Sequence, residues 1–243
     1  MTDPRTTARS TSETSLETPD LVIFDCDGVL VDTEPLTLDA MRRWIASCGL
    51  DLSYDEVANR YKGTHLSVIQ PAVEAEIGRP IDDFVDGYRS LMFKAFEAGV
   101  EPIPGVVETL DALDAAGIAM CVASNGPHVK MDASMAASGL ADRFGGLKRD
   151  GGERIFSADD IATPKPAPDL FLHAAEAMGV APDRCVVVED SPSGIVAARA
   201  AGMRCVAYVD VTPIEALRAE GPDLIIESMA DLPAALGLTS TRR

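Results

Sequence analysis

Two aspartates stand two positions apart behind a short apolar run, in the sequence Asp25-Cys26-Asp27-Gly28. Because side chains alternate along extended backbone, Asp25 and Asp27 should point to the same side. Two neighbouring carboxylates repel each other, so one tends to hold a proton unless a cation neutralises the pair. Such a pair suits a reaction in which one carboxylate attacks and the other moves a proton. The simpler alternative is a turn with two solvated aspartates.

Two further clusters could bind an anion, and each also follows an apolar run. Ser124 and Asn125 combine a hydroxyl with backbone amides at an expected helix start, where phosphate oxygens can bind. The same residues are also common helix caps. Lys165 stands between Pro164 and Pro166, which restrict the local backbone and could aim the lysine at an anion. Alternatively, Lys165 is an exposed loop residue.

A fourth cluster, Glu189-Asp190, supplies two more acids behind an apolar run. Paired carboxylates can bind a hard cation, and Mg²⁺ typically uses one or two of them together with waters and a substrate phosphate. An acidic turn is the alternative here. Taken together, the four clusters indicate a metal-assisted phosphate site more strongly than any one of them does.

Strand-like and helix-like segments alternate along the chain between these clusters. Apolar runs predict buried parallel strands, and periodic segments that often end at glycine predict helices between them. This alternation predicts a doubly wound, Rossmann-like α/β sheet, in which ligands collect at the carboxyl ends of the strands. The predicted strands span residues 21–24, 118–123, 185–188, 205–209 and 224–226, and the predicted core helices span residues 106–116, 128–138, 168–178 and 195–201.

Residues 35–100 interrupt this alternation, because they contain helical patterns and no convincing buried strand. We therefore expect a small all-α cap domain, inserted after the first strand, with an α/β core formed by residues 20–34 and 101–243. The two adjacent connectors should act as a hinge. The predicted cap helices span residues 36–48, 54–60, 66–77 and 81–98.

Composition limits the possible partners. The net charge of −18, without any extended basic run, argues against nucleic-acid and anionic-membrane partners. No apolar run approaches membrane-spanning length, and residues 1–19 lack the apolar stretch of a secretory signal and should form a disordered tail. The five cysteines form no CxxC pair, which argues against a zinc site. Three of them stand in apolar runs as expected core residues, which fits a reduced, cytoplasmic setting. We expect a monomer that acts on a small phosphorylated metabolite.

In these four clusters the chain resembles a known family, the haloacid dehalogenase superfamily. Within it, the chain is most similar to the phosphatases with a helical cap after the first strand (subclass I). The resemblance extends over about residues 21–235, and all four family motifs occur in order. These motifs are Asp25-Cys26-Asp27-Gly28-Val29-Leu30-Val31-Asp32-Thr33-Glu34, Ser124-Asn125, Lys165-Pro166 and Glu189-Asp190-Ser191.

The resemblance implies a role for each motif residue. Asp25 would attack phosphorus and form an aspartyl phosphate, while Asp27 would protonate the leaving alcohol and then activate water. Ser124, Asn125 and Lys165 would bind the transferring phosphoryl group. Magnesium would be the cofactor, and its implied ligands are Asp25, the backbone carbonyl of Asp27, Asp190 and, as a possible further ligand, Glu189.

Residue differences separate the members of this superfamily. Asp27 argues against dehalogenases, which lack the second aspartate. β-Phosphoglucomutases are the serious competitor, but they carry a histidine and a cap arginine where this chain has Thr37 and Leu66. Residues 121–131 and 60–63 are most similar to bacterial 6-phosphogluconate phosphatases. The resemblance therefore favours hydrolysis of a small sugar, sugar-acid or polyol phosphate, with a mutase as the second possibility and a non-enzymatic phosphate binder as the third.

Cap residues would set the specificity of such an enzyme. Lys62, Gly63 and His65, together with Lys130 from the core, are candidates for contact with the leaving group. Surface lysines and histidines are more often simply solvated. We expect the cap aromatics to form the cap core rather than a ligand platform, namely Trp44, Phe84, Tyr88, Phe93 and Phe96.

Overall fold

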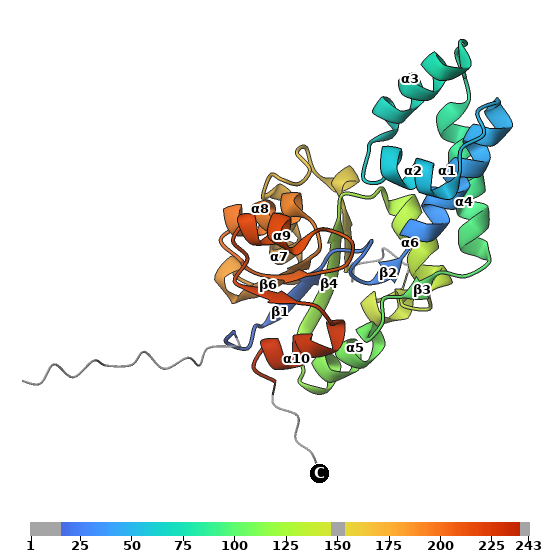
Figure 1. Cartoon of the computed structure of the whole chain (residues 1–243). Coiled ribbons are helices and arrows are strands. Elements are labelled where there is room, and N and C mark those ends of the chain that lie inside the picture. Colours follow the sequence, from blue (N-terminus) through green and yellow to red (C-terminus); the bar gives the residue numbers. More distant parts are fainter. Residues whose placement is uncertain (1–15, 147–153, 239–243) are drawn as a thin grey trace, which may run out of the picture.

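The computed structural model describes residues 16–146 and 154–238, and a six-stranded parallel sheet lies at its centre (Figure 1). The strand order is β5-β4-β1-β6-β7-β8. This doubly wound arrangement confirms the predicted fold class. The strands are β1 (Leu21–Phe24), β4 (Ala119–Ser124), β5 (Ile155–Ser157), β6 (Cys185–Glu189), β7 (Arg204–Tyr208) and β8 (Leu224–Ile226).

Strand β1 lies inside the sheet, with a parallel neighbour on each side. Leu21 is in register with Ala119 of β4 and with Cys185 of β6. All four residues of β1 are fully buried, as expected for a strand covered on both faces. Its carboxyl end, where Asp25 follows, therefore lies between the ends of β4 and β6.

Alternate side chains of the sheet enter two separate apolar layers. On one face, Val22 and Phe24 pack with residues of α5, α6 and α10. On the other face, Leu21 and Ile23 pack with residues of α7, α8 and α9. These helices are α5 (Val106–Ala115), α6 (His128–Ala137), α7 (Asp169–Met178), α8 (Pro192–Ala200), α9 (Ile214–Ala219) and α10 (Leu232–Ala235).

Four helices follow β1 before the chain returns to the core at residue 101, and they stand beside the core in Figure 1. They bury their own apolar cluster, which includes Ile45, Val57 and Phe84. A short antiparallel ribbon of β2 (Val31–Asp32) and β3 (Glu101–Pro102) joins the outgoing and returning chain. The cap helices are α1 (Glu34–Cys48), α2 (Tyr54–Tyr61), α3 (Leu66–Ile77) and α4 (Phe84–Glu97).

Several details differ from the sequence-based expectation. Strand β5 and the β2–β3 ribbon were not predicted. Helix α8 begins at Pro192, three residues before the predicted start, because the Ser191 hydroxyl accepts a hydrogen bond from the Gly194 amide and caps it. Single 3₁₀ turns connect other elements, at η1 (Ala141–Phe144), η2 (Ala158–Asp160), η3 (Pro182–Arg184) and η4 (Met229–Asp231).

The predicted tail lies mostly outside the described residues, which begin at residue 16. The Leu16 amide donates to the Ala235 carbonyl at 2.7 Å, and the Thr18 hydroxyl donates to Leu236. Residues 16–18 are therefore attached to the end of α10. Within the described ranges, no helix is long and apolar enough to cross a membrane. The monomeric state and the cytoplasmic location stay predictions.

Candidate active site

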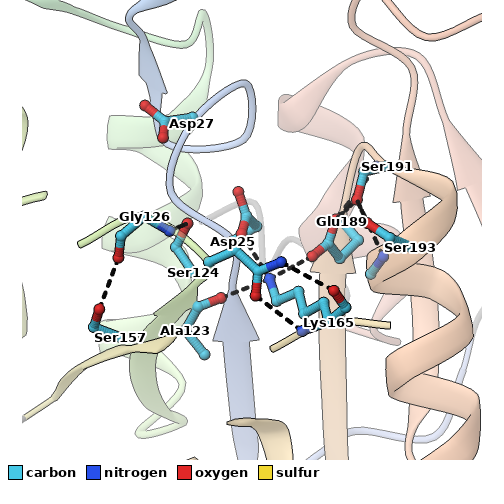
Figure 2. Close-up of polar contacts among 12 residues, drawn as sticks. Asp25, Asp27, Ala123, Ser124, Gly126, Ser157, Lys165, Glu189, Ser191 and Ser193 are labelled. Atoms are coloured by element: carbon cyan, nitrogen blue, oxygen red, sulfur yellow. Dashed lines mark hydrogen bonds and ion pairs between the residues drawn. The ribbon is translucent and has the colours of Figure 1, made fainter. Parts of the chain in front are cut away.

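Asp25 extends β1 by one residue and lies at the carboxyl edge of the sheet. Its amide donates to the Val188 carbonyl of β6 at 3.0 Å, which fixes the backbone beside that strand. Its carboxylate accepts from the Lys165 ammonium at 2.6 Å (Figure 2). Burial raises the pKa of Asp25 to about 6, against the opposing effect of Lys165. Asp25 is therefore mostly ionised at neutral pH and can act as a nucleophile.

Lys165 is a buried cation held from three sides. Besides Asp25, it donates to Glu189 at 2.5 Å and to the Ala123 carbonyl at 2.8 Å. Its ammonium also lies 4.6 Å from the centre of the Phe171 ring. Burial alone would lower the pKa of Lys165, but the carboxylates of Asp25 and Glu189 outweigh it, so the pKa is raised. Lys165 thus keeps its charge.

Glu189 is the deepest of these acids, with 1% of its surface exposed. One oxygen receives Lys165, and the other receives the Ser191 hydroxyl at 2.8 Å. Residue 194 must be glycine, because a Cβ at Gly194 would lie 1.9 Å from the Glu189 carboxyl carbon. Both oxygens of Glu189 are engaged in orienting Lys165 and the start of α8.

Ser124 ends β4 and Asn125 follows it, and both line the same space. The Asn125 side chain accepts from the Lys165 amide at 2.9 Å and donates to the Lys165 carbonyl at 3.1 Å. Its amide group therefore fixes the lysine loop. The Ser124 hydroxyl is buried and accepts from the Gly126 amide at 3.3 Å, as drawn in Figure 2.

Asp27 stands apart from the buried group around Lys165 (Figure 2). One of its oxygens accepts from the Thr33 hydroxyl at 2.5 Å, and the other accepts from the Lys130 ammonium at 2.6 Å. The Asp27 side chain is 30% exposed, so water can reach it. Lys130 comes from α6 of the core, and it contacts Asp27 in addition to lining the cavity.

Asp190 provides the second carboxylate that a metal ion would need beside Asp25. Burial, together with the nearby carboxylates of Asp25, Glu189 and Asp210, raises its pKa to about 8. The backbone of Gly28 approaches closely, since a Cβ there would lie 2.5 Å from an Asp190 oxygen. A bound cation would relieve this concentration of negative charge.

The available donors fit magnesium better than a metal that requires a complete cage of side chains. Within the described part of the chain, no three acidic, histidine or cysteine side chains are grouped as a metal site. Mg²⁺ does not need three, because it retains waters and binds one or two carboxylates together with phosphate oxygens. Asp25, Asp190 and the backbone carbonyl of Asp27 are a set of this kind.

A cavity of about 660 Å³ connects this cluster with the cap. Asp25, Asp27 and Lys165 lie among its core residues, while Lys62 and His65 lie among its cap residues. The cavity is large enough for a small metabolite. The candidate residues from the four motifs and from the cap therefore border one space.

The cap candidates already have local partners. The Lys62 ammonium pairs with Glu34 at 2.5 Å, while the His65 ring accepts from the Ser67 amide and caps α3. Gly63 has a φ of +67°, and a Cβ there would meet no atom within 4 Å. The two positions that distinguish mutases, Thr37 and Leu66, also line the cavity.

Some lining residues were not identified from the sequence. Thr33 was quoted only as part of a motif, and Arg89 of α4 was not considered, although both line the cavity. Tyr88 and Phe93 also line it, in addition to packing in the cap, so assigning them to the cap core was incomplete. An arginine on an amphipathic helix carries no local signal that would separate it from a solvated one.

Comparison with known proteins agrees with this geometry. The family of haloacid dehalogenase-like hydrolases matches residues 19–202. The 6-phosphogluconate phosphatase of Escherichia coli (strain K12) is 36% identical over 184 residues, which cover 75% of this chain and 79% of that protein.

Two solved structures share the fold along nearly the whole chain. A family hydrolase from Deinococcus radiodurans with bound phosphate and sodium has a TM-score of 0.76 and 30% identity, covering 92% of this chain and 98% of that one. A candidate β-phosphoglucomutase from Thermotoga maritima has a TM-score of 0.77 and 26% identity, covering 91% and 99%.

The fold and the site together define a hydrolase with a Rossmann-like core, a helical cap and an acidic carboxyl edge of the sheet. The chain belongs to the haloacid dehalogenase-like hydrolase family. The predicted family and the prediction of a phosphatase-type enzyme are confirmed by these matches.

Proposed function

We propose that this enzyme is a magnesium-dependent phosphatase that hydrolyses a small sugar, sugar-acid or polyol phosphate monoester. The observation that carries the proposal is the buried Asp25 carboxylate, held 2.6 Å from Lys165 at the floor of a cavity that Asp27 also borders. The 6-phosphogluconate phosphatase of E. coli supports a sugar-acid phosphate as the first substrate to test.

The chain's own residues account for both chemical steps. In the first, an Asp25 oxygen attacks phosphorus and the bond to the leaving oxygen breaks, while Asp27 gives its proton to that oxygen. In the second, water attacks phosphorus, Asp27 takes a proton from the water, and the bond between phosphorus and Asp25 breaks. Ser124, the main chain at Asn125, and Lys165 would bind the phosphoryl oxygens.

Magnesium, held by Asp25, Asp190 and the Asp27 backbone carbonyl, would neutralise the charge that builds up on the phosphoryl oxygens. Both oxygens of Glu189 are occupied by Lys165 and Ser191, so we assign it a positioning role. The cap residues Lys62, Gly63 and His65 would face the leaving group. The division into core (20–34 and 101–243) and cap (35–100) is part of the same proposal.

The hexose phosphate mutase is the principal competitor. A mutase must hold a second phosphate in the cap, and this chain has Thr37 and Leu66 at the positions where β-phosphoglucomutases carry a histidine and a cap arginine. A mutase would convert a hexose 1-phosphate to the 6-phosphate with little free phosphate. A non-enzymatic phosphate binder, the third possibility, would release no phosphate and would not require Asp27.

A screen of phosphate release over sugar, sugar-acid, polyol and nucleotide monophosphates tests this proposal. We expect Mg²⁺-dependent release from at least one sugar-type ester. Asp25→Asn should abolish it, because the amide is a very poor nucleophile. Asp27→Asn should lower it by about 10²–10⁴-fold, the usual contribution of a general acid or base. Full activity in Asp25→Asn, or isomerised product without free phosphate, would reject the phosphatase.

A further inference from the structure

Helix α4 contributes one side of the cavity, through residues that include Tyr88 and Arg89. These side chains come from the cap. They add polar groups to a cavity much larger than a phosphate group needs, since its volume is about 660 Å³. The part of the substrate beyond the phosphate would therefore lie near α4.

The basic side chains around the cavity differ in whether they are already neutralised. Lys165 pairs with Asp25 and Glu189, Lys130 pairs with Asp27, and Lys62 pairs with Glu34. Arg89 differs from these three. Over residues 16–146 and 154–238, no carboxylate forms an ion pair with it.

The absence of a partner for Arg89 is not due to a lack of nearby acids in the sequence. Asp86 lies three residues earlier on the same helix, a spacing that allows ion pairs on helix surfaces, yet the two do not form one. The exposed guanidinium of Arg89 lines the cavity instead. Its planar fork of donors suits a carboxylate or a phosphate better than a lysine does.

Tyr88 connects Arg89 with the chemical step. Its hydroxyl lies within the electrostatic influence of Lys130, Asp27 and Arg89. Burial raises the pKa of Tyr88, so the hydroxyl stays protonated and can donate a hydrogen bond. Within the described ranges, this hydroxyl makes no hydrogen bond with another protein group. Tyr88 and Arg89 thus both line the cavity with donors that no other group in the described part of the chain engages.

We propose that Arg89 forms a subsite for a second oxyanionic group, a carboxylate or a phosphate, at the end of the substrate remote from the scissile phosphate, with the Tyr88 hydroxyl donating a hydrogen bond to the substrate between its two ends. This inference rests on the proposed phosphatase function and narrows its substrate class to esters with two anionic ends. An unpaired cation is needed there because the chain's net charge of −18 opposes the approach of such a substrate.

The test compares kcat/KM for three six-carbon substrates in wild type and Arg89→Gln. The substrates are 6-phosphogluconate with a distal carboxylate, glucitol 1,6-bisphosphate with a distal phosphate, and glucitol 6-phosphate with a neutral end. Charge-assisted hydrogen bonds contribute enough to predict a loss on the order of tenfold or more on an anionic substrate. The loss on glucitol 6-phosphate should stay below about twofold.

Two further variants distinguish recognition from a general effect. Arg43→Gln removes another exposed cap arginine, which lies on α1 and does not line the cavity, and it should leave all three values unchanged. Arg89→Lys should recover part of the loss, because charge returns without the fork. Tyr88→Phe should show a smaller loss on the same anionic substrate.

The two anionic substrates identify the natural group, since the one with the larger loss in Arg89→Gln is the one that the subsite binds. Equal losses on the neutral and anionic substrates, or no loss on either anionic substrate, would overturn the subsite while leaving the phosphatase intact. If wild type released phosphate from no ester at all, the proposed function itself would fail, so the two failures are distinguishable.

Discussion

Lys165 lies between two carboxylates with 2% of its side chain exposed. At such burial, the attraction between the charges offsets their loss of hydration only while all of them are present. Lys165→Met would leave Asp25 and Glu189 as buried charges without their cation. We predict a loss of about 3–5 kcal/mol in the free energy of unfolding, measured by urea denaturation.

Two companion variants test the reason for that loss. Adding Glu189→Gln to Lys165→Met removes one of the two stranded charges and should recover part of the stability. Lys94→Met, an exposed lysine on α4, should change it by less than about 0.5 kcal/mol. A Lys165→Met protein as stable as wild type would mean that the carboxylates do not depend on this lysine.

Asp190 gives a pH dependence of stability with a definite sign. Its pKa is about 8 in the folded chain, against 3.8 for an ordinary aspartate, so the folded state holds the proton to higher pH. The contribution of Asp190 to the free energy of unfolding is therefore fully present below about pH 4 and is lost as pH rises toward 8. Asp25, with a pKa of about 6, acts in the same direction.

In EDTA, we predict that wild type unfolds more easily at pH 8 than at pH 5.5, by on the order of 2 kcal/mol. Asp190→Asn should remove much of this difference, and Mg²⁺ should reduce it in wild type but not in the variant. Asp51→Asn, at an exposed position, should retain it. Urea unfolding at the two pH values measures each case, and identical pH dependence in wild type and Asp190→Asn would contradict the account.

At the residue scale, sequence reasoning brought the motif residues to one site but could not assign their contacts. Asn125 was predicted to bind phosphate, which stays a prediction, and its side chain also binds the main chain of Lys165, 40 residues away. The contact between Lys130 and Asp27 spans 103 residues. Contacts this remote depend on how loops meet at the sheet edge, which no local pattern encodes.

At the scale of elements, the packing of α1 against α4 gives a further test. A Cβ at Gly87 would lie 2.0–2.5 Å from the Trp44 ring, so only glycine allows these two helices to come so close. We predict that Gly87→Ala destabilises the cap by about 1–3 kcal/mol through overpacking.

Trp44 is the chain's single tryptophan and lies in the cap, so its fluorescence reports on this region directly. The Gly87→Ala transition followed by Trp44 emission should move to lower urea concentration. Ser90→Ala, an exposed position on the same helix, should leave it in place. An unchanged transition in Gly87→Ala would show that the helices can separate without cost.

Predictability also varied among the elements. Short apolar runs located β1, β4 and β6 because a strand buried on both faces requires such a sequence. Strand β5 has three residues, too few for a pattern to stand out. The start of α8 could have been read from Ser191 and Pro192, since a serine cap followed by proline is a strong helix-start signal.

At the scale of the whole molecule, the α/β core provides the acids and Lys165, while the helical insertion provides the other side of the cavity. The alternation of strands and helices made this architecture predictable, because few topologies satisfy it. The cavity was not predictable in detail, since its lining combines residues of α1, α4 and α6 with the strand ends. Arg89 became a candidate only once these elements were placed together.

In the proposed reaction Asp25 receives the phosphoryl group from the substrate. Trapping the phosphorylated Asp25 is the most direct test of that role. The Asp27→Asn variant, mixed with Mg²⁺ and p-nitrophenyl phosphate, should become phosphorylated, because this leaving group needs no proton, and should then hydrolyse slowly. Mass spectrometry of the quenched protein should find one added phosphoryl group on the peptide that contains Asp25, and none after Asp25→Asn. Phosphate release by Asp27→Asn with no covalent phosphate on that peptide, or a phosphoryl group on another residue, would contradict the account.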